Sequence, residues 1–168
     1  MSDLIPNPDG SSERRTKFPA APPMVIDAAK TYSAEMVTSM GTMTIHLDPI
    51  GAPQTVNNFV FLARDGYYDG VTFHRVLENF MAQSGDPTGL GTGGPGYTIP
   101  DEGGQFLPTS NGGLIGPFTY QPGDLVMARS AGPNSSGAQF FFATGITTLF
   151  WIVARIGTDE LATTSLGI

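Results

Sequence analysis

The chain has 168 residues and a mass of 17.7 kDa, and its 40% hydrophobic content is enough for the core of one domain. The net charge of −7 argues against binding to nucleic acid or to anionic lipid, because both are themselves negatively charged. There is no cysteine, and His46 and His74 are the only histidines, which excludes disulfides and predicts neither a metal site nor a cofactor. No apolar run is long enough to cross a membrane, and we expect a cytoplasmic location.

Residues 1–31 are polar, interrupted by prolines and without hydrophobic periodicity. They predict a flexible arm that either drapes over the rest of the protein or stays mobile, followed by one domain over residues 32–168. The pair Arg14 and Arg15 matches part of a twin-arginine export signal. Because the proline-rich residues 19–23 follow instead of an apolar stretch, the pair is interpreted as a solvated basic patch.

Hydrophobic periodicity begins at Tyr32. Residues 34–38 and 43–47 flank Met40-Gly41 and predict a hairpin whose second strand alternates between apolar and polar residues, with His46 on the polar face. A helix is expected to begin at Pro53 and end at Gly66. It carries an apolar stripe that covers the core, made of Val56, Phe59, Val60 and Ala63.

Residues 73–87 place one permanent cation, Arg75, among apolar side chains. Two short strands around a turn at Glu78-Asn79 would bring Arg75 into one patch with Phe80, Met81 and Gln83. Strict alternation places Phe73 on the face of Arg75 and His74 on the opposite face. There we expect His74 to form hydrogen bonds within the sheet and to play a structural role.

The glycine-rich residues 85–96 contain a formal GxGxxG pattern at Gly89, Gly91 and Gly94. A dinucleotide-binding loop must follow a strand and open a helix, whereas Pro95 and Gly96 come next, so the pattern does not indicate such a site. The carboxylates of Asp101 and Glu102 follow in a loop and are interpreted as solvated rather than catalytic.

Two segments in this order resemble the signatures of the cyclophilins, which are peptidyl-prolyl cis/trans isomerases. The first is Phe-His-Arg at 73–75 with Phe-Met-Ala-Gln at 80–83 and the loop Gly-Asp-Pro-Thr-Gly that begins at Gly85. The second is Met-Ala-Arg-Ser-Ala-Gly-Pro-Asn over 127–134, continuing to Gln-Phe-Phe at 139–141. The chain departs from the family pattern at Asn79 and Ser84, where glycine is usual, and by one extra residue near Arg129.

The resemblance implies a mainly β fold, in which a closed antiparallel β-barrel is capped by helices. It implies a catalytic role for Arg75, Phe80 and Gln83. The residues that the resemblance places in substrate binding are Met81, Gly91, Ala128, Arg129, Ser130, Ala131, Gln139 and Phe141. The expected partners are proline-containing peptides and unfolded or partly folded client proteins, bound by a monomer.

The C-terminal residues 147–168 depart from the family. The Leu-Asp-Gly segment is absent, no histidine follows the second signature, and Trp151 does not align with the pocket tryptophan, which predicts weak cyclosporin binding. Residues 150–156 are rich in β-formers and predict one more strand, although the barrel could be incomplete here. Three hypotheses therefore stay open: an active isomerase, a noncatalytic proline-peptide binding module, and a truncated homologue that folds poorly.

Overall fold

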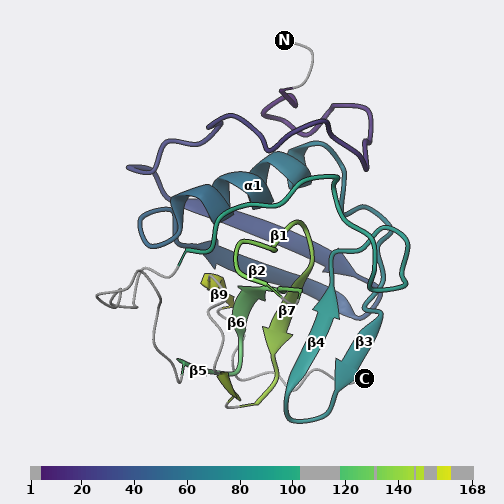
Figure 1. Cartoon of the computed structure of the whole chain (residues 1–168), viewed down its shortest axis with the longest axis vertical. Coiled ribbons are helices and arrows are strands. Elements are labelled where there is room, and N and C mark those ends of the chain that lie inside the picture. Colours follow the sequence, from purple (N-terminus) through teal and green to yellow (C-terminus); the bar gives the residue numbers. More distant parts are fainter. Residues whose placement is uncertain (1–4, 103–117, 131, 146, 150–154, 160–168) are drawn as a thin grey trace.

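The computed structural model describes residues 5–102, 118–130, 132–145, 147–149 and 155–159. The fold is mainly β, with one helix in this part of the chain (Figure 1). Ten elements are described, in this order: β1 Tyr32–Thr38, β2 Gly41–Leu47, α1 Pro53–Arg64, β3 Arg75–Leu77, β4 Met81–Ser84, β5 Phe118–Tyr120, β6 Asp124–Met127, β7 Phe140–Ala143, β8 Thr147–Leu149 and β9 Arg155–Asp159.

The strands β1 and β2 form the predicted hairpin, with Thr38 opposite Gly41 at the turn. Met43, Ile45 and Leu47 are buried and His46 is exposed, as the alternation predicts. The helix α1 begins at Pro53 and is followed by Gly66, whose φ of 66° suits a glycine after a helix C-terminus. The hairpin and the helix are confirmed, but the helix ends at Arg64 rather than at Gly66. Of the predicted apolar stripe, Val56, Phe59 and Val60 are buried, whereas Ala63 is exposed.

The strands β3 and β4 flank a turn in which Phe80 N–H donates to the Leu77 carbonyl. Asn79 lies in this turn with a φ of 55°, a left-handed conformation that asparagine tolerates better than most residues. The departure from the family glycine at this position therefore leaves the hairpin intact.

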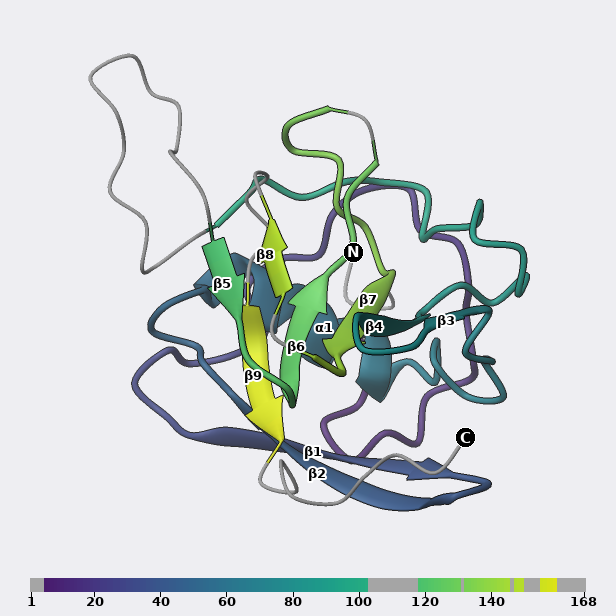
Figure 2. The same cartoon turned by 90° about the horizontal axis from the view of Figure 1, so that it is seen from below.

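The main sheet has seven strands in the order β1-β2-β9-β6-β7-β4-β3, and β5 pairs with β8 in a separate two-stranded sheet. In Figure 2, β9 lies between β6 and the β1-β2 hairpin. The predicted strand at 150–156 is thus only partly tested, because residues 150–154 and Trp151 lie outside the described residues and β9 begins at Arg155. In the described strand order, β1 and β3 are the two ends, and closure into a barrel stays a prediction.

The two faces of the central strands have different surroundings. The rings of Phe59 and Tyr68 pack against Phe140, at centroid distances of 6.0 and 5.5 Å, so this face of β7 is covered by α1 and the segment after it. Because side chains alternate along a strand, Phe141 lies on the opposite face. Its ring contacts Tyr120 at 6.4 Å.

Residues 5–31 lie along α1 and the glycine-rich loop (Figure 1). Phe18 and Ile26 are buried, and the side-chain oxygen of Asn57 accepts hydrogen bonds from the N–H groups of Val25 and Ile26. These contacts join the segment to the domain that the sequence places after Tyr32, while the division into arm and domain stays a prediction. No helix among the described residues is long and apolar enough to span a membrane.

Candidate active site

Arg75, Gln83 and Phe141 form one row across three strands. Arg75 of β3 pairs with Gln83 of β4, and Gln83 pairs with Phe141 of β7. Directly opposed residues of antiparallel strands project to the same face, so the row lies on the face away from α1. Nη1 of the exposed Arg75 donates to Oε1 of Gln83 over 3.5 Å, a long hydrogen bond that leaves the guanidinium accessible to a ligand.

Two glutamine amides orient this cation. Nε2 of Gln139 donates to the carbonyl oxygens of Gly91 and Gly93 over 3.0 and 2.8 Å. Its Oε1 therefore faces Gln83 and accepts from Nε2 of Gln83 over 2.9 Å. Oε1 of Gln83 is thereby turned toward Arg75, and the two loop carbonyls determine the direction of every hydrogen bond in the series.

The loop that supplies these carbonyls is built around Asp86, which is buried. Its carboxylate accepts hydrogen bonds from the N–H and hydroxyl of Thr88 and from Gly93 N–H. Burial by itself would raise the pKa of Asp86, but these hydrogen bonds and one from Gly91 N–H outweigh it and lower the pKa to about 2. The carboxylate is therefore ionised at neutral pH, and in this form it accepts the hydrogen bonds of the loop.

Sequence reasoning did not single out Asp86. The signal was present, because Asp-Pro-Thr-Gly is a pattern in which an aspartate side chain accepts from the N–H two residues later. Gly93 is a second residue that sequence reasoning did not identify as important for the loop. A Cβ at Gly93 would lie about 3.0 Å from the Thr88 methyl and closer still to the Asp86 carboxylate, so only glycine fits there.

An apolar floor lies beside the polar series. Met81 and Phe141 are buried, at 3% and 6% exposure, and Phe80 is partly buried against the same core cluster. Leu77, which pairs with Met81, is 39% exposed and continues the apolar surface onto the edge strand β3. Three members of the predicted patch, Arg75, Met81 and Gln83, are therefore brought together by β3 and β4, and the fourth, Phe80, directly precedes β4.

The predicted substrate-binding residues after β6 lie in a loop attached to the same site. Ala128 N–H donates to the Gln139 carbonyl over 2.8 Å. The Arg129 guanidinium pairs with Asp101 at 3.1 Å and donates to the Gly132 carbonyl over 2.9 Å. Ser130 is exposed, and Ala131 lies outside the described residues.

The interpretation of Asp101 and Glu102 as solvated is wrong. Besides pairing with Arg129, Asp101 exchanges hydrogen bonds with Asn134. The Glu102 carboxylate accepts from the N–H groups of Gln54 and Thr55 over 3.0 and 2.7 Å, and so caps α1, where Ala52 provides no side-chain cap. The partners of Asp101 and of Glu102 lie far from them in the sequence, and no local pattern predicts these contacts.

The expected hydrogen bonds of His74 are also absent. Both ring nitrogens are buried and have no hydrogen-bond partner among the described residues. The ring lies against Gly91, where a Cβ would come within 3.2 Å of it. Phe73 contacts Phe142 on the α1 side rather than sharing the face of Arg75. Alternation fails because β3 begins only at Arg75.

Within the described residues, no group of three or more histidines, aspartates or glutamates is arranged to hold a metal ion. The site consists of a permanent cation, two amides and apolar side chains. Such a set can donate hydrogen bonds and exclude water, and it needs no proton transfer.

Comparison with known proteins gives consistent matches. A Synechococcus elongatus protein named peptidyl-prolyl cis-trans isomerase is 46% identical over 108 residues, which are 64% of this chain and 66% of that protein. A Staphylococcus aureus relative is 48% identical over 106 residues, 63% of this chain and 49% of its own length. The chain thus spans about half to two thirds of the curated relatives it matches.

Among solved structures, a cyclophilin type peptidyl-prolyl cis-trans isomerase of Cryptosporidium parvum superposes with a TM-score of 0.65 at 29% identity, covering 77% of this chain and 78% of that chain. The same protein solved in the presence of the dipeptide Ala-Pro gives 0.64 at 30% identity, covering 76% and 78%. The model of the family "Cyclophilin type peptidyl-prolyl cis-trans isomerase/CLD" matches residues 33–150. The chain therefore belongs to the cyclophilin-type peptidyl-prolyl cis-trans isomerase family.

Proposed function

We propose that the protein catalyses cis/trans rotation of X-Pro peptide bonds in protein chains. The observation that carries this proposal is the row of Arg75, Gln83 and Phe141, in which an oriented cation lies beside buried apolar side chains. Its substrates would be proline-containing peptides and unfolded or partly folded client proteins. The structure of the Cryptosporidium parvum relative obtained with Ala-Pro supports this class of ligand.

The reaction breaks no covalent bond, but the barrier to rotation about a peptide bond is about 18–20 kcal/mol. In the twisted amide conjugation is lost, and the proline nitrogen recovers a lone pair that can accept a hydrogen bond. A guanidinium is ionised at any working pH and has several donors, so Arg75 can supply this hydrogen bond without a proton shuttle. Because its Nη1 is held by Gln83, other donors of the fork are directed away from Gln83.

One hydrogen bond is not enough for a useful rate. A thousandfold acceleration needs about 4 kcal/mol of preference for the transition state, whereas a hydrogen bond to a charged group is worth about 1.5–3 kcal/mol. We assign the remainder to the apolar floor of Phe80, Met81 and Phe141, which would hold the proline ring and keep water from the amide.

The peptide itself would bind along the loop after β6. We propose that backbone groups of residues 128–131 pair with it like an added strand, and that Gln83 and Gln139 hold Arg75 and the substrate carbonyl in register. The Arg129 side chain is already paired with Asp101, so the peptide would meet the backbone of this loop rather than that guanidinium. Gly91 would contribute indirectly, through its carbonyl on Gln139.

Closure of the main sheet into a barrel is part of the proposal. It is supported by the position of β9 between β2 and β6, with Leu47 opposite Gly157 and Asp124 opposite Thr158. A strand in this position argues against the hypothesis of a poorly folding homologue. The monomeric state, the cytoplasmic location and weak cyclosporin binding stay predictions.

A protease-coupled isomerisation assay on an X-Pro peptide tests the function. We expect activity in the wild type and a loss of at least about tenfold in kcat/KM for Arg75→Ala, corresponding to one lost charge-assisted hydrogen bond. Lys30→Ala is the matched control, because it removes an exposed positive charge from the N-terminal segment. Circular dichroism must show that all three proteins are folded.

The main rival is a binding module that keeps the peptide site without turnover. A folded wild type that binds an X-Pro peptide in a titration, but gives no rate above the uncatalysed background, would favour this rival. Equal rates for the wild type and Arg75→Ala would show that Arg75 does not act in catalysis.

A further inference from the structure

The N-terminal segment crosses the molecule on the side of the glycine-rich loop. Residues 14–18, named here the strap, contact the end of α1 on one side and residues 94–96 of the loop on the other. The strap precedes Tyr32, the first residue of the predicted domain. It also precedes residue 33, where the family match begins.

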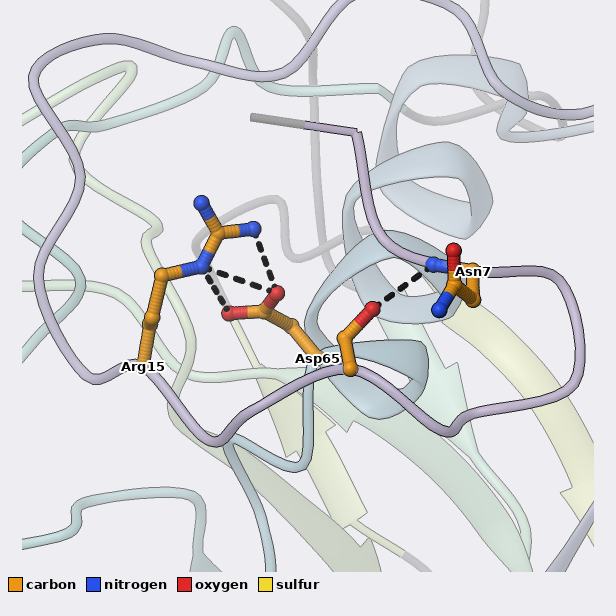
Figure 3. Close-up of polar contacts among 4 residues, drawn as sticks. Asn7, Arg15 and Asp65 are labelled. Atoms are coloured by element: carbon orange, nitrogen blue, oxygen red, sulfur yellow. Dashed lines mark hydrogen bonds and ion pairs between the residues drawn. The ribbon is translucent and has the colours of Figure 1, made fainter. Parts of the chain in front are cut away.

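The first contact of the strap is an ion pair. Arg15 Nε donates to both oxygens of the buried Asp65 carboxylate over 3.0 Å, directly after α1 (Figure 3). The neighbouring Arg14 donates through Nε to the Gly66 carbonyl over 3.0 Å. Nη2 of Arg15 also donates to the Asp65 carboxylate, so two nitrogens of the guanidinium bind it. A bidentate pair of this kind has a defined geometry, so the start of the strap is held to the end of the helix.

The second contact is apolar. Phe18 is 7% exposed and belongs to a core cluster separate from the main one. Its ring meets Phe61 of α1 at 5.3 Å and Tyr97, directly after the loop, at 6.3 Å. The Arg15 guanidinium lies over the same ring at 5.4 Å. The Phe18 ring therefore joins the helix to the C-terminal end of the loop.

The third contact is with the loop backbone. Phe18 N–H donates to the Pro95 carbonyl over 2.8 Å, and Lys17 Nζ donates to the Gly94 carbonyl over 2.6 Å. A Cβ on Gly96 would lie 2.8 Å from the Phe18 carbonyl oxygen, so the two backbones are in close contact. The carbonyls of Gly94 and Pro95 directly follow the Gly93 carbonyl, which orients Gln139.

We propose that the strap is a positioning element of the active site, in which Lys17 and Phe18 hold the glycine-rich loop so that Gln139, Gln83 and Arg75 are correctly oriented. Lys17 and Phe18 are positioning residues, because they act through the loop carbonyls and do not touch the proposed peptide site. The catalytic consequence rests on the proposed isomerase function, whereas the orientation of the two glutamines does not.

The test uses the full chain with Lys17→Met and Phe18→Ala, and two controls from the same segment, Lys30→Met and Met24→Ala. Lys30 and Met24 are exposed, so the controls remove a similar charge and a similar apolar group without loosening the loop. The readouts are kcat and KM for an X-Pro peptide, the thermal unfolding midpoint, and the NMR signals of the side-chain amides of Gln83 and Gln139.

We expect kcat/KM to fall between roughly 2-fold and 30-fold in both strap variants, the range that residues acting at a distance usually span. The loss should fall on kcat more than on KM, because Arg75 is proposed to act on the twisted amide. The amide signals of Gln83 and Gln139 should shift in the strap variants and not in the controls. Lys17→Arg keeps a donor for the Gly94 carbonyl, so its kcat, its KM and its glutamine amide signals should match those of the wild type.

Unshifted glutamine signals and an unchanged kcat in a folded Lys17→Met would overturn the proposal, and so would a lower unfolding midpoint as the only effect. If Phe18→Ala does not fold, Lys17→Met and Lys17→Arg alone test the proposal. Lys17 is exposed, so we expect both of these variants to fold. If the wild type has no isomerase activity, the proposed function fails. The NMR signals then still decide whether the strap orients the two glutamines.

Discussion

Nε2 of Gln83 donates to Oε1 of Gln139 over 2.9 Å, and this hydrogen bond connects β4, which pairs with the strand of Arg75, to the glutamine that the glycine-rich loop holds. The loop imposes the direction of this hydrogen bond. The carbonyls of Gly91 and Gly93 are acceptors, so the NH2 group of Gln139 must face them and its oxygen must face Gln83. The orientation of the exposed Arg75 therefore depends on backbone atoms that it does not contact.

Reversing the polarity at position 139 should disrupt this series. In Gln139→Glu a carboxylate oxygen would face the carbonyls of Gly91 and Gly93, which would lose their donor. Both carbonyls are partly buried. Leaving such groups unpaired costs about 1–3 kcal/mol, so we expect kcat/KM to fall about tenfold or more. The exposed Gln121 supplies the control Gln121→Glu. Steady-state kinetics in which the two variants are equally active would contradict the relay.

The ionised Asp86 should make stability depend on acidic pH. Its pKa is about 2 in the folded protein, below the ordinary value of 3.8. A lowered folded-state pKa stabilises the protein fully above the unfolded pKa, and this contribution is lost as the pH falls from about 4 toward 2. The ionised Asp86 carboxylate contributes about 2 kcal/mol to the free energy of unfolding at neutral pH. Urea unfolding of the wild type and Asp86→Asn measures it.

The free-energy difference between the wild type and Asp86→Asn should be largest near neutral pH and should shrink as the pH approaches about 2. Comparing the two proteins at each pH removes the contribution of the other carboxylates. A difference that stays constant over this range would show that ionisation of Asp86 does not stabilise the loop.

Two adjacent glycines should respond differently to alanine. A Cβ on Gly93 would press on the Asp86 carboxylate and the Thr88 methyl, whereas a Cβ on Gly94 would meet nothing within 4 Å. We expect Gly93→Ala to destabilise the protein by about 1–3 kcal/mol and to lower kcat/KM, and Gly94→Ala to change stability by less than about 0.5 kcal/mol. Thermal unfolding and the isomerase assay measure both effects. Equal effects of the two substitutions would refute the proposed packing around Asp86.

The helix cap supplied by Glu102 should be measurable in the same way. Glu102→Gln removes a negative charge that accepts from the N–H groups of Gln54 and Thr55, so the free energy of unfolding should fall by about 1 kcal/mol. Glu78→Gln, at an exposed position of the β3-β4 turn, is the control. The difference in the free energy of unfolding between Glu102→Gln and its control should decrease at high salt. Equal stability of the two variants would show that the Glu102 carboxylate does not stabilise α1.

Local patterns predicted the elements well. Period-2 alternation gave the β1-β2 hairpin and the exposed His46, and apolar spacing after Pro53 gave α1. The same reasoning failed at His74 because the strand begins one residue later, so alternation does not apply before Arg75. It also failed at Asp101 and Glu102, whose partners Arg129 and Thr55 come from other segments.

By itself, the sequence determined the types of residue in the candidate site and the family signatures that contain them. These depend on side-chain chemistry and short spacings, which are visible without a fold. Only the tertiary structure decided which way the amides of Gln83 and Gln139 point and what Phe18 contacts. A hydrogen bond depends on atoms being within about 3 Å and correctly aligned. For these groups, the decisive atoms belong to segments far away in the chain.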